Sequence, residues 1–265
     1  GNLINLEILN LYDNNLIGVI PSEIGNLINL RELTLSNNQL TGQIPLEIGN
    51  LINLERLHLR FNQFTGVIPI EIGNLINLTH LELNYNQLIE HIPLEVGNLF
   101  NLTHLTLHGN QLSGNIPPEL GNLTNLNYLK LEENQLTGEI PVDLGNLINL
   151  ELINLSYNEL SGLIPGSFCN QGVTTPLVYS NKLCPPYPSC ISQNDIESQD
   201  TLECEECIDG LGDLNDDNII NIGDIIILIN CILTYDGCSI CFDINQDNNF
   251  SILDIIILID IILDN

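Results

Sequence analysis

The sequence repeats itself every 24 residues from residue 1 to about residue 168. Proline keeps this step from Pro21 to Pro165. Asparagine keeps it at Asn14, Asn38, Asn62, Asn86, Asn110, Asn134 and Asn158. A unit of this length cannot bury its own apolar face, so copies must stack on one another to form a core. The repeat therefore predicts an elongated solenoid.

One unit, Leu54 to Asn77, reads LERLHLRFNQFTGVIPIEIGNLIN. Its first half follows the pattern L-x-x-L-x-L-x-x-N-x-L and resembles the leucine-rich repeat, while x-G-x-I-P-x-E-I-G-N-L resembles the plant-type subclass. The resemblance implies an α/β-type repeat solenoid over residues 1–168, with seven repeats and a parallel β-sheet on its concave face. We expect the Asn14 column to bond backbone groups as a ladder. The core should contain the columns of Leu6, Leu9, Leu11 and Leu16.

Acidic residues far outnumber basic ones: 34 Asp and Glu against five Lys and Arg give a net charge of -29. Such a surface repels phosphate backbones and anionic lipids, which argues against nucleic-acid partners. The most apolar run, Ile255 to Leu263, is too short to span a bilayer, so no membrane insertion is expected. No signal peptide is visible, and Gly1 begins inside a repeat, which indicates a mature or partial chain. Eight cysteines, all after residue 168, predict disulfides in a secreted or cell-surface protein.

The variable positions of the predicted concave strands hold the candidate ligand-binding residues. Four of the five His lie there, as do four of the five Lys and Arg once Arg31 beside this face is included. We expect a basic, imidazole-rich and aromatic strip containing Tyr12, Arg56, His58, Arg60, Phe61, His80, Tyr85, His104, His108 and Tyr128. The plain alternative is a set of solvated strand positions, and a metal site held by these His is a weaker one. No nucleophile and base arrangement indicates an enzyme.

The repeat ends at Phe168, and residues 169–190 resemble the C-terminal cap of plant-type leucine-rich repeats. This resemblance implies a disulfide between Cys184 and Cys190 that covers the last coil. Residues 191–209 are polar and acidic, and we interpret them as a linker. The remaining cysteines are expected to form disulfides in pairings that the sequence leaves open. The alternative is a zinc site, because the spacing C-x-x-C occurs at Cys204 and Cys207 and again at Cys238 and Cys241.

Two matching segments begin 30 residues apart, at Asp213 and Asp243. Each fits a twelve-residue calcium loop followed directly by a helix, with side-chain oxygens at positions 1, 3, 5, 9 and 12 and a carbonyl at position 7. The first loop would use Asp213, Asn215, Asp217, Asn221 and Asp224, with the carbonyl of Ile219. The second would use Asp243, Asn245, Asp247, Ser251 and Asp254, with the carbonyl of Asn249. The pattern predicts two bound calcium ions.

A duplicated loop and helix without an entering helix resembles a type I dockerin, and the resemblance covers residues 210–265. It implies a small all-α domain that docks, with calcium bound, onto a cohesin-like domain of a scaffold protein. The positions that usually contact cohesin hold Ile222-Gly223 and Ile252-Leu253, so the predicted contact surface is apolar. Both helices are more apolar than one buried face requires. The surplus belongs either to the core or to a docking patch.

The leading hypothesis is an extracellular, non-enzymatic recognition or adhesion module. Its concave strip would bind a protein or glycan ligand, and its dockerin-like domain would attach it to a scaffold or surface. The alternative is a subunit of a fibre or surface layer, in which copies of the chain meet head to tail because the first coil has no N-terminal cap. A fifth N-x-S/T sequon lies at Asn249, inside a predicted calcium loop. Four others are candidate glycosylation sites, at Asn77, Asn101, Asn122 and Asn154.

Overall fold

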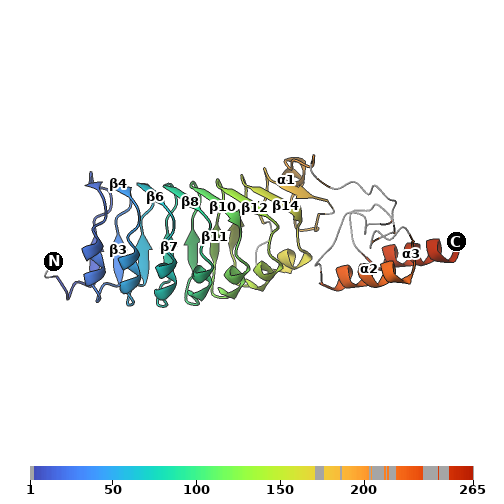
Figure 1. The fold of residues 1–265 in the computed structure, drawn as a ribbon, viewed down its shortest axis with the longest axis horizontal. Helices are drawn as coiled ribbons and strands as arrows, with labels where there is room; N and C mark the ends of the chain where they lie inside the picture. Colours follow the sequence, from blue (N-terminus) through green and yellow to red (C-terminus); the bar gives the residue numbers. More distant parts are fainter. Residues whose placement is uncertain are drawn as a thin grey trace.

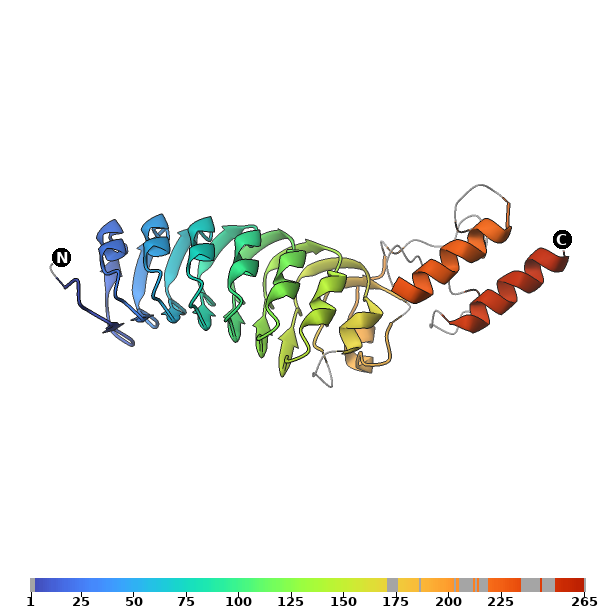
Figure 2. The same cartoon turned by 90° about the horizontal axis from the view of Figure 1, so that it is seen from below.

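The computed structural model describes residues 3–170, 176–185, 187–202, 204, 212, 214, 219–234, 244 and 251–264. The repeats form an elongated solenoid, as predicted, and two longer helices follow it in the chain (Figure 1). Each complete coil contains a short strand, a turn, a second short strand and a 3-10 helix. The 3-10 helices lie in one row along the solenoid (Figure 2).

The first strands of the coils form one seven-stranded parallel sheet, whose register advances by one repeat per strand. Leu57, for example, pairs with Leu33 on one side and Leu81 on the other. All three are fully buried, whereas the residues on either side of them face outward on the concave surface. The strands are β1 (Ile8–Asn10), β3 (Glu32–Thr34), β5 (Arg56–His58), β7 (His80–Glu82), β9 (His104–Thr106), β11 (Tyr128–Lys130) and β13 (Leu152–Asn154).

The second strands form an eight-stranded parallel sheet that β15 closes. They are β2 (Ile17–Gly18), β4 (Gln39–Gly42), β6 (Gln63–Gly66), β8 (Gln87–Glu90), β10 (Gln111–Asn115), β12 (Gln135–Gly138), β14 (Glu159–Leu163) and β15 (Lys182–Cys184). The 3-10 helices are η1 (Ser22–Asn26), η2 (Leu46–Asn50), η3 (Ile70–Asn74), η4 (Leu94–Asn98), η5 (Pro118–Asn122), η6 (Val142–Asn146) and η7 (Gly166–Asn170).

The repeating I-P-x-E-I-G-N segment has a physical reason at each end. Pro45 precedes η2 with φ -69°, so its fixed dihedral leads the chain into the helix without losing a needed donor. Gly49 lies where a Cβ would approach the Cβ of Glu71 to 2.5 Å. A side chain at this position would therefore push neighbouring coils apart, which explains the repeated glycine.

The repeated asparagine forms the predicted ladder. Nδ2 of Asn86 donates to the carbonyl of Leu83 in its own coil at 3.0 Å and to that of Leu59 in the preceding coil at 3.1 Å. Its Oδ1 accepts from the backbone N–H of Phe64 at 3.1 Å. One buried carboxamide thus satisfies backbone groups on two coils and ties them together.

An eighth, shortened coil follows the seven predicted repeats. Leu177 bridges to Asn154 of the first sheet, and β15 pairs with β14 in the second. Asn181 occupies the ladder position, and its Nδ2 donates to the carbonyl of Leu155 at 3.1 Å. Asn181 follows Asn158 by 23 residues instead of 24, so the repeat pattern did not reveal it.

The predicted disulfide between Cys184 and Cys190 is wrong. The structure pairs Cys169 with Cys190 and Cys184 with Cys204. Cys184 is the last residue of β15 and pairs with Leu163 of β14, so it is held at the sheet edge. The following segment returns instead to η7, which carries Cys169. Because Cys204 is bonded to sulfur, the zinc alternative that required it is also wrong.

Part of the segment predicted to be a linker belongs to the cap. Helix α1 (Gln193–Glu197) begins after Ser192, and its Asp195 is buried. The carboxylate of Asp195 accepts from the backbone N–H of Val178 at 2.8 Å. Backbone N–H of Asp200 donates to the carbonyl of Asn181 at 2.8 Å. These bonds hold residues 192–200 against the shortened coil.

The two helices predicted after the acidic loops are present as α2 (Ile222–Thr234) and α3 (Ile252–Asp264). They pack on each other around a small core of their own that contains Leu228, Cys231, Ile244 and Leu258. No helix in the described ranges is long and apolar enough to cross a membrane.

Replacing Asn86 by Ala should lower the free energy of unfolding by about 1–3 kcal/mol, because it leaves the buried N–H of Phe64 without a partner. Exposed Asn77 is the matched control, since its Nδ2 makes one bond, to the carbonyl of Ile52. Urea unfolding followed by circular dichroism measures both variants. Equal midpoints for Asn86→Ala and Asn77→Ala would contradict a ladder role.

Candidate ligand-binding face

The concave sheet places the predicted strip residues in columns, one residue per coil. The register pairs His80 with His104 and His104 with Tyr128, so these rings lie side by side on β7, β9 and β11. Ring centroids are 4.2 Å apart for the two His and 4.6 Å apart for His104 and Tyr128, both stacked. His58 meets His80 edge-on at 6.0 Å.

A second row of rings follows the strand ends. Phe61 and Tyr85 stack at 4.6 Å, and Tyr85 meets His108 edge-on at 4.9 Å. Both Phe61 and Tyr85 are exposed and have positive φ, 52° and 54°, which bulky residues rarely adopt. Gly109 makes room for this row, because a Cβ there would lie 2.5 Å from Cδ1 of Tyr85. Exposed aromatic rings held by strained backbone are typical of functional sites.

The strip is less basic than predicted because its arginines are paired. Arg56 forms an ion pair with Glu32 at 3.5 Å, and Arg60 forms one with Glu82 at 3.5 Å. Both acids come from variable positions of neighbouring strands, so spacing along one coil does not reveal the pairing. Arg31 is also paired, with Glu55.

The imidazoles are neutral at pH 7. Burial lowers the pKa of His80 to about 4, and the neighbouring His104 lowers it further. Burial together with Lys130 and Arg60 lowers the pKa of His108 to about 4. The pKa values of His58 and His104 are lowered as well, chiefly by burial. The centre of the strip is therefore an aromatic surface with neutral nitrogens.

Two predicted features of the strip are not supported by the geometry. Tyr12 lies apart from the ring rows, and its hydroxyl accepts from Nδ2 of Asn37 at 3.2 Å. Among the described residues no group of three His, Cys, Asp or Glu could hold a metal ion. The rings of His80 and His104 are nearly parallel, with 12° between their planes, so their nitrogens do not converge on one point.

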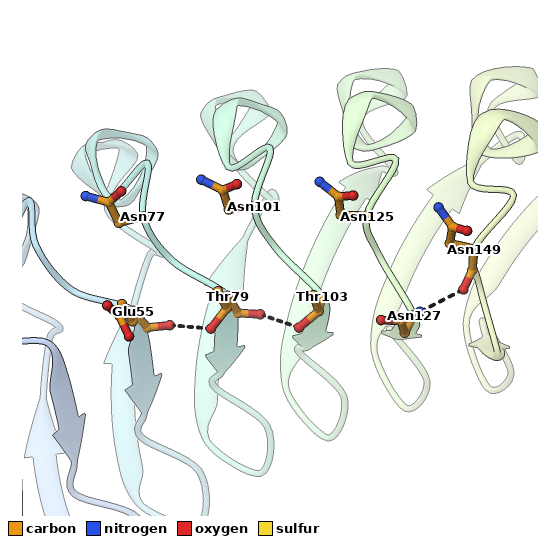
Figure 3. A pocket seen from close by; sticks show the side chains of 8 residues that line it. All are labelled: Glu55, Asn77, Thr79, Asn101, Thr103, Asn125, Asn127 and Asn149. Atoms are coloured by element: carbon orange, nitrogen blue, oxygen red, sulfur yellow. Dashed lines mark hydrogen bonds between the residues drawn. The ribbon is translucent and has the colours of Figure 1, made fainter.

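A polar trough runs beside the concave sheet, and the sequence analysis missed it as a surface. About 570 Å³ of open space is lined by Glu55, Asn77, Thr79, Asn101, Thr103, Asn125, Asn127 and Asn149 (Figure 3). Nδ2 of Asn77 and Asn101 donates to the carbonyls of Ile52 and Ile76, both at 2.9 Å. These two sequon residues are exposed in the trough, and Asn154 is half-buried on β13. Glycosylation stays a prediction.

Only part of the two predicted calcium loops lies within the described residues. Asp224 and Asp254 are fully buried at the starts of α2 and α3. Asp224 accepts from the backbone N–H of Leu214 and of Asn221, both at 2.7 Å. Asp254 accepts from the backbone N–H of Ser251 at 2.8 Å. Seven predicted ligands lie outside the described residues: Asp213, Asn215, Asp217, Asp243, Asn245, Asp247 and Asn249.

The chain belongs to the leucine-rich repeat family. The family pattern, described as Leucine Rich Repeat, matches residues 5–27, 29–51, 53–75, 77–99, 101–123, 125–147 and 149–171. No protein with a curated description matches the chain.

Solved structures of similar fold include receptor ectodomains of Arabidopsis thaliana. The ectodomain of the receptor kinase GASSHO1/SCHENGEN3, in complex with CASPARIAN STRIP INTEGRITY FACTOR 2, is 39% identical with a TM-score of 0.66, over 68% of this chain and 22% of that one. The HAESA ectodomain, in complex with an IDA peptide hormone, is 40% identical with a TM-score of 0.64, over 67% and 30%. A plant ice-binding protein is 32% identical with a TM-score of 0.61, over 66% and 57%.

The aligned region spans about a fifth to a third of the length of these receptor ectodomains. Their similarity and the two disulfides of the cap indicate an extracellular protein.

The lowered pKa values of His80 and His108 predict a loss of stability in acid. An unfolded chain binds these protons near pH 6.5, whereas the folded chain binds them only near pH 4. Because the unfolded state binds more protons in between, the free energy of unfolding should fall as the pH drops from about 6.5 towards 4. NMR titration should find both rings neutral at pH 5, and replacing both with Gln should flatten the thermal melting profile over this range. Titration midpoints near 6.5 would contradict the assignment.

Proposed function

We propose that the chain is an extracellular recognition module whose concave face binds a peptide segment of a partner protein. The observation that carries this proposal is the pair of ring rows, formed by His58, His80, His104 and Tyr128 and by Phe61, Tyr85 and His108. Both rows run from coil to coil, which suits a ligand extended along the solenoid. Receptor ectodomains similar to this chain form complexes with a peptide hormone and with an integrity factor.

The concave face favours a unique ligand over a repeating one. Its variable columns change from coil to coil, so the ring rows occupy only the coils from β5 to β11. A repeating lattice or a uniform polymer would be matched by side chains that recur in every coil. Strained backbone at Phe61 and Tyr85 adds that this part of the face is held in a set geometry.

The C-terminal helices are proposed to form the calcium-binding, dockerin-like attachment domain. Asp224 and Asp254 are fully buried, and the sequence contains no Lys, Arg or His after Lys182. A buried carboxylate is costly unless a positive charge lies beside it. A hard divalent cation supplies that charge and prefers the oxygen donors that both loops provide. The donor set therefore fits calcium.

The exposed faces of α2 and α3 are proposed as the docking surface. Each helix presents an apolar stripe with the same spacing, and the two stripes are related by 30 residues: Ile222, Ile226, Ile229 and Leu233 on α2, and Ile252, Ile256, Ile259 and Leu263 on α3. The surplus apolar residues thus divide between a core and an exposed face. Because the surrounding domain is acidic, the fitting partner is an apolar surface with a basic rim, on a scaffold protein. Net charge -29 disfavours copies of the chain as partners, so the fibre alternative stays a prediction.

Selection from a random peptide library tests recognition by the concave face. Clones that bind the chain should lose at least about tenfold in affinity when Phe61 and Tyr85 are replaced by Ala, since aromatic anchors dominate such contacts. Phe100 is the matched control, because it is an equally exposed ring that lies off the concave sheet. Clones whose binding falls equally in Phe100→Ala, or a library without binding clones, would refute the proposal.

Calorimetric titration with calcium tests the attachment domain. The chain should bind two ions, and Asp224→Asn or Asp254→Asn should each remove one, because each replaces a buried charged ligand with a neutral one. Asp195→Asn is the matched control, since Asp195 is a buried carboxylate of the cap that bonds Val178. A chain that takes up no calcium, or loses none in the two loop variants, would show the assignment to be wrong.

A further inference from the structure

We propose that the concave face selects its ligand through a row of three bare hydrogen-bond acceptors and that this ligand is a basic peptide. The acceptor row consists of Nε2 of His80, Nε2 of His104 and the phenolic oxygen of Tyr128, on β7, β9 and β11. The proposal rests on the proposed function of this face and adds the chemistry of the partner.

The hydrogen bonds of Thr79 decide which nitrogen of His80 carries the proton. Oγ1 of Thr79 lies 2.9 Å from the carbonyl oxygen of Glu55 and 2.9 Å from Nδ1 of His80. Each of these short contacts needs one hydrogen, and the carbonyl has none to give. The single hydroxyl hydrogen points at the carbonyl, so Nδ1 of His80 must be the donor in the second contact. Nε2 of the neutral ring is then a bare lone pair.

The same arrangement recurs one coil further. Oγ1 of Thr103 donates to the carbonyl of Thr79 at 3.0 Å and lies 2.9 Å from Nδ1 of His104. Figure 3 shows the bonds from Thr79 and Thr103 to the preceding coil. His104 is therefore held in the same tautomer as His80. Among the residues that the structure describes, no donor contacts Nε2 of either ring.

Tyr128 completes the row. Its hydroxyl donates to Oε2 of Glu151, so its oxygen can only accept a further hydrogen bond. The three rings are stacked in register on adjacent parallel strands, which are separated by about 4.8 Å. Three acceptors thus face the concave side at one regular spacing.

The charges around the row favour a cationic donor. Arg60 and Arg56 are occupied by Glu82 and Glu32, which leaves the strip without a strong site for anions. A ligand carboxylate or phosphate carries only acceptors and would face bare lone pairs. Guanidinium groups carry five N–H donors and no acceptor, and the net charge of -29 attracts them. Arginine side chains of an extended peptide therefore fit the row.

Binding of a hexa-arginine peptide at pH 7.5 and physiological salt tests the proposal, with hexa-glutamate as the reference. The combined variant His80→Phe with His104→Phe keeps two stacked rings and the net charge but removes both lone pairs. It should weaken hexa-arginine binding at least about tenfold. His91→Phe makes the same chemical change at an exposed residue after β8, off the concave sheet, and should bind as the unmodified chain does.

Unweakened binding by the double Phe variant would show that hexa-arginine is attracted by bulk charge alone, and would overturn the proposal. So would an unmodified chain that does not bind hexa-arginine. Long-range ¹H–¹⁵N NMR of the free protein should show Nδ1–H rings at both His, and Nε2–H rings would also overturn it. If library clones bind through Phe61 and Tyr85 but are acidic or uncharged, the basic-ligand proposal fails while recognition by the concave face stands.

Discussion

Contact between successive coils is the constraint on which the rest of this structure depends. A single coil has leucines on one side and unsatisfied backbone groups at its turn, so it is stable only against its neighbours. The asparagine ladder supplies the polar part of that contact, as Asn86 does between the carbonyls of Leu59 and Leu83. Because the ladder sets every coil at the same register, rings from adjacent strands meet at stacking distance.

Much of the fold was predictable because a strict period reports its own packing. The 24-residue step identified the buried leucines, the ladder and the concave columns, including His80, His104 and Tyr128. The cap was not predictable in the same way, since Asn181 breaks the period by one residue. The disulfide pairing depends on how the chain returns from β15 to η7, which no local pattern encodes.

The chemistry of the concave face was harder to predict than its membership. Whether Arg60 is free or paired depends on Glu82 of the next coil, and the tautomers of His80 and His104 depend on Thr79 and Thr103. Both are contacts between particular side chains, and the repeat pattern says only which columns they occupy. The strip predicted to be basic is for this reason neutral and rich in acceptors.

One residue per coil in each row has an evolutionary consequence. Deleting or duplicating a whole coil leaves every ladder bond with an equivalent partner, so the fold survives the change. The rows, however, are spliced at that point: loss of residues 77–100 would place Arg56 beside His104 in place of His80. Recombination between repeats can therefore create new recognition surfaces in single steps, at little risk to the core.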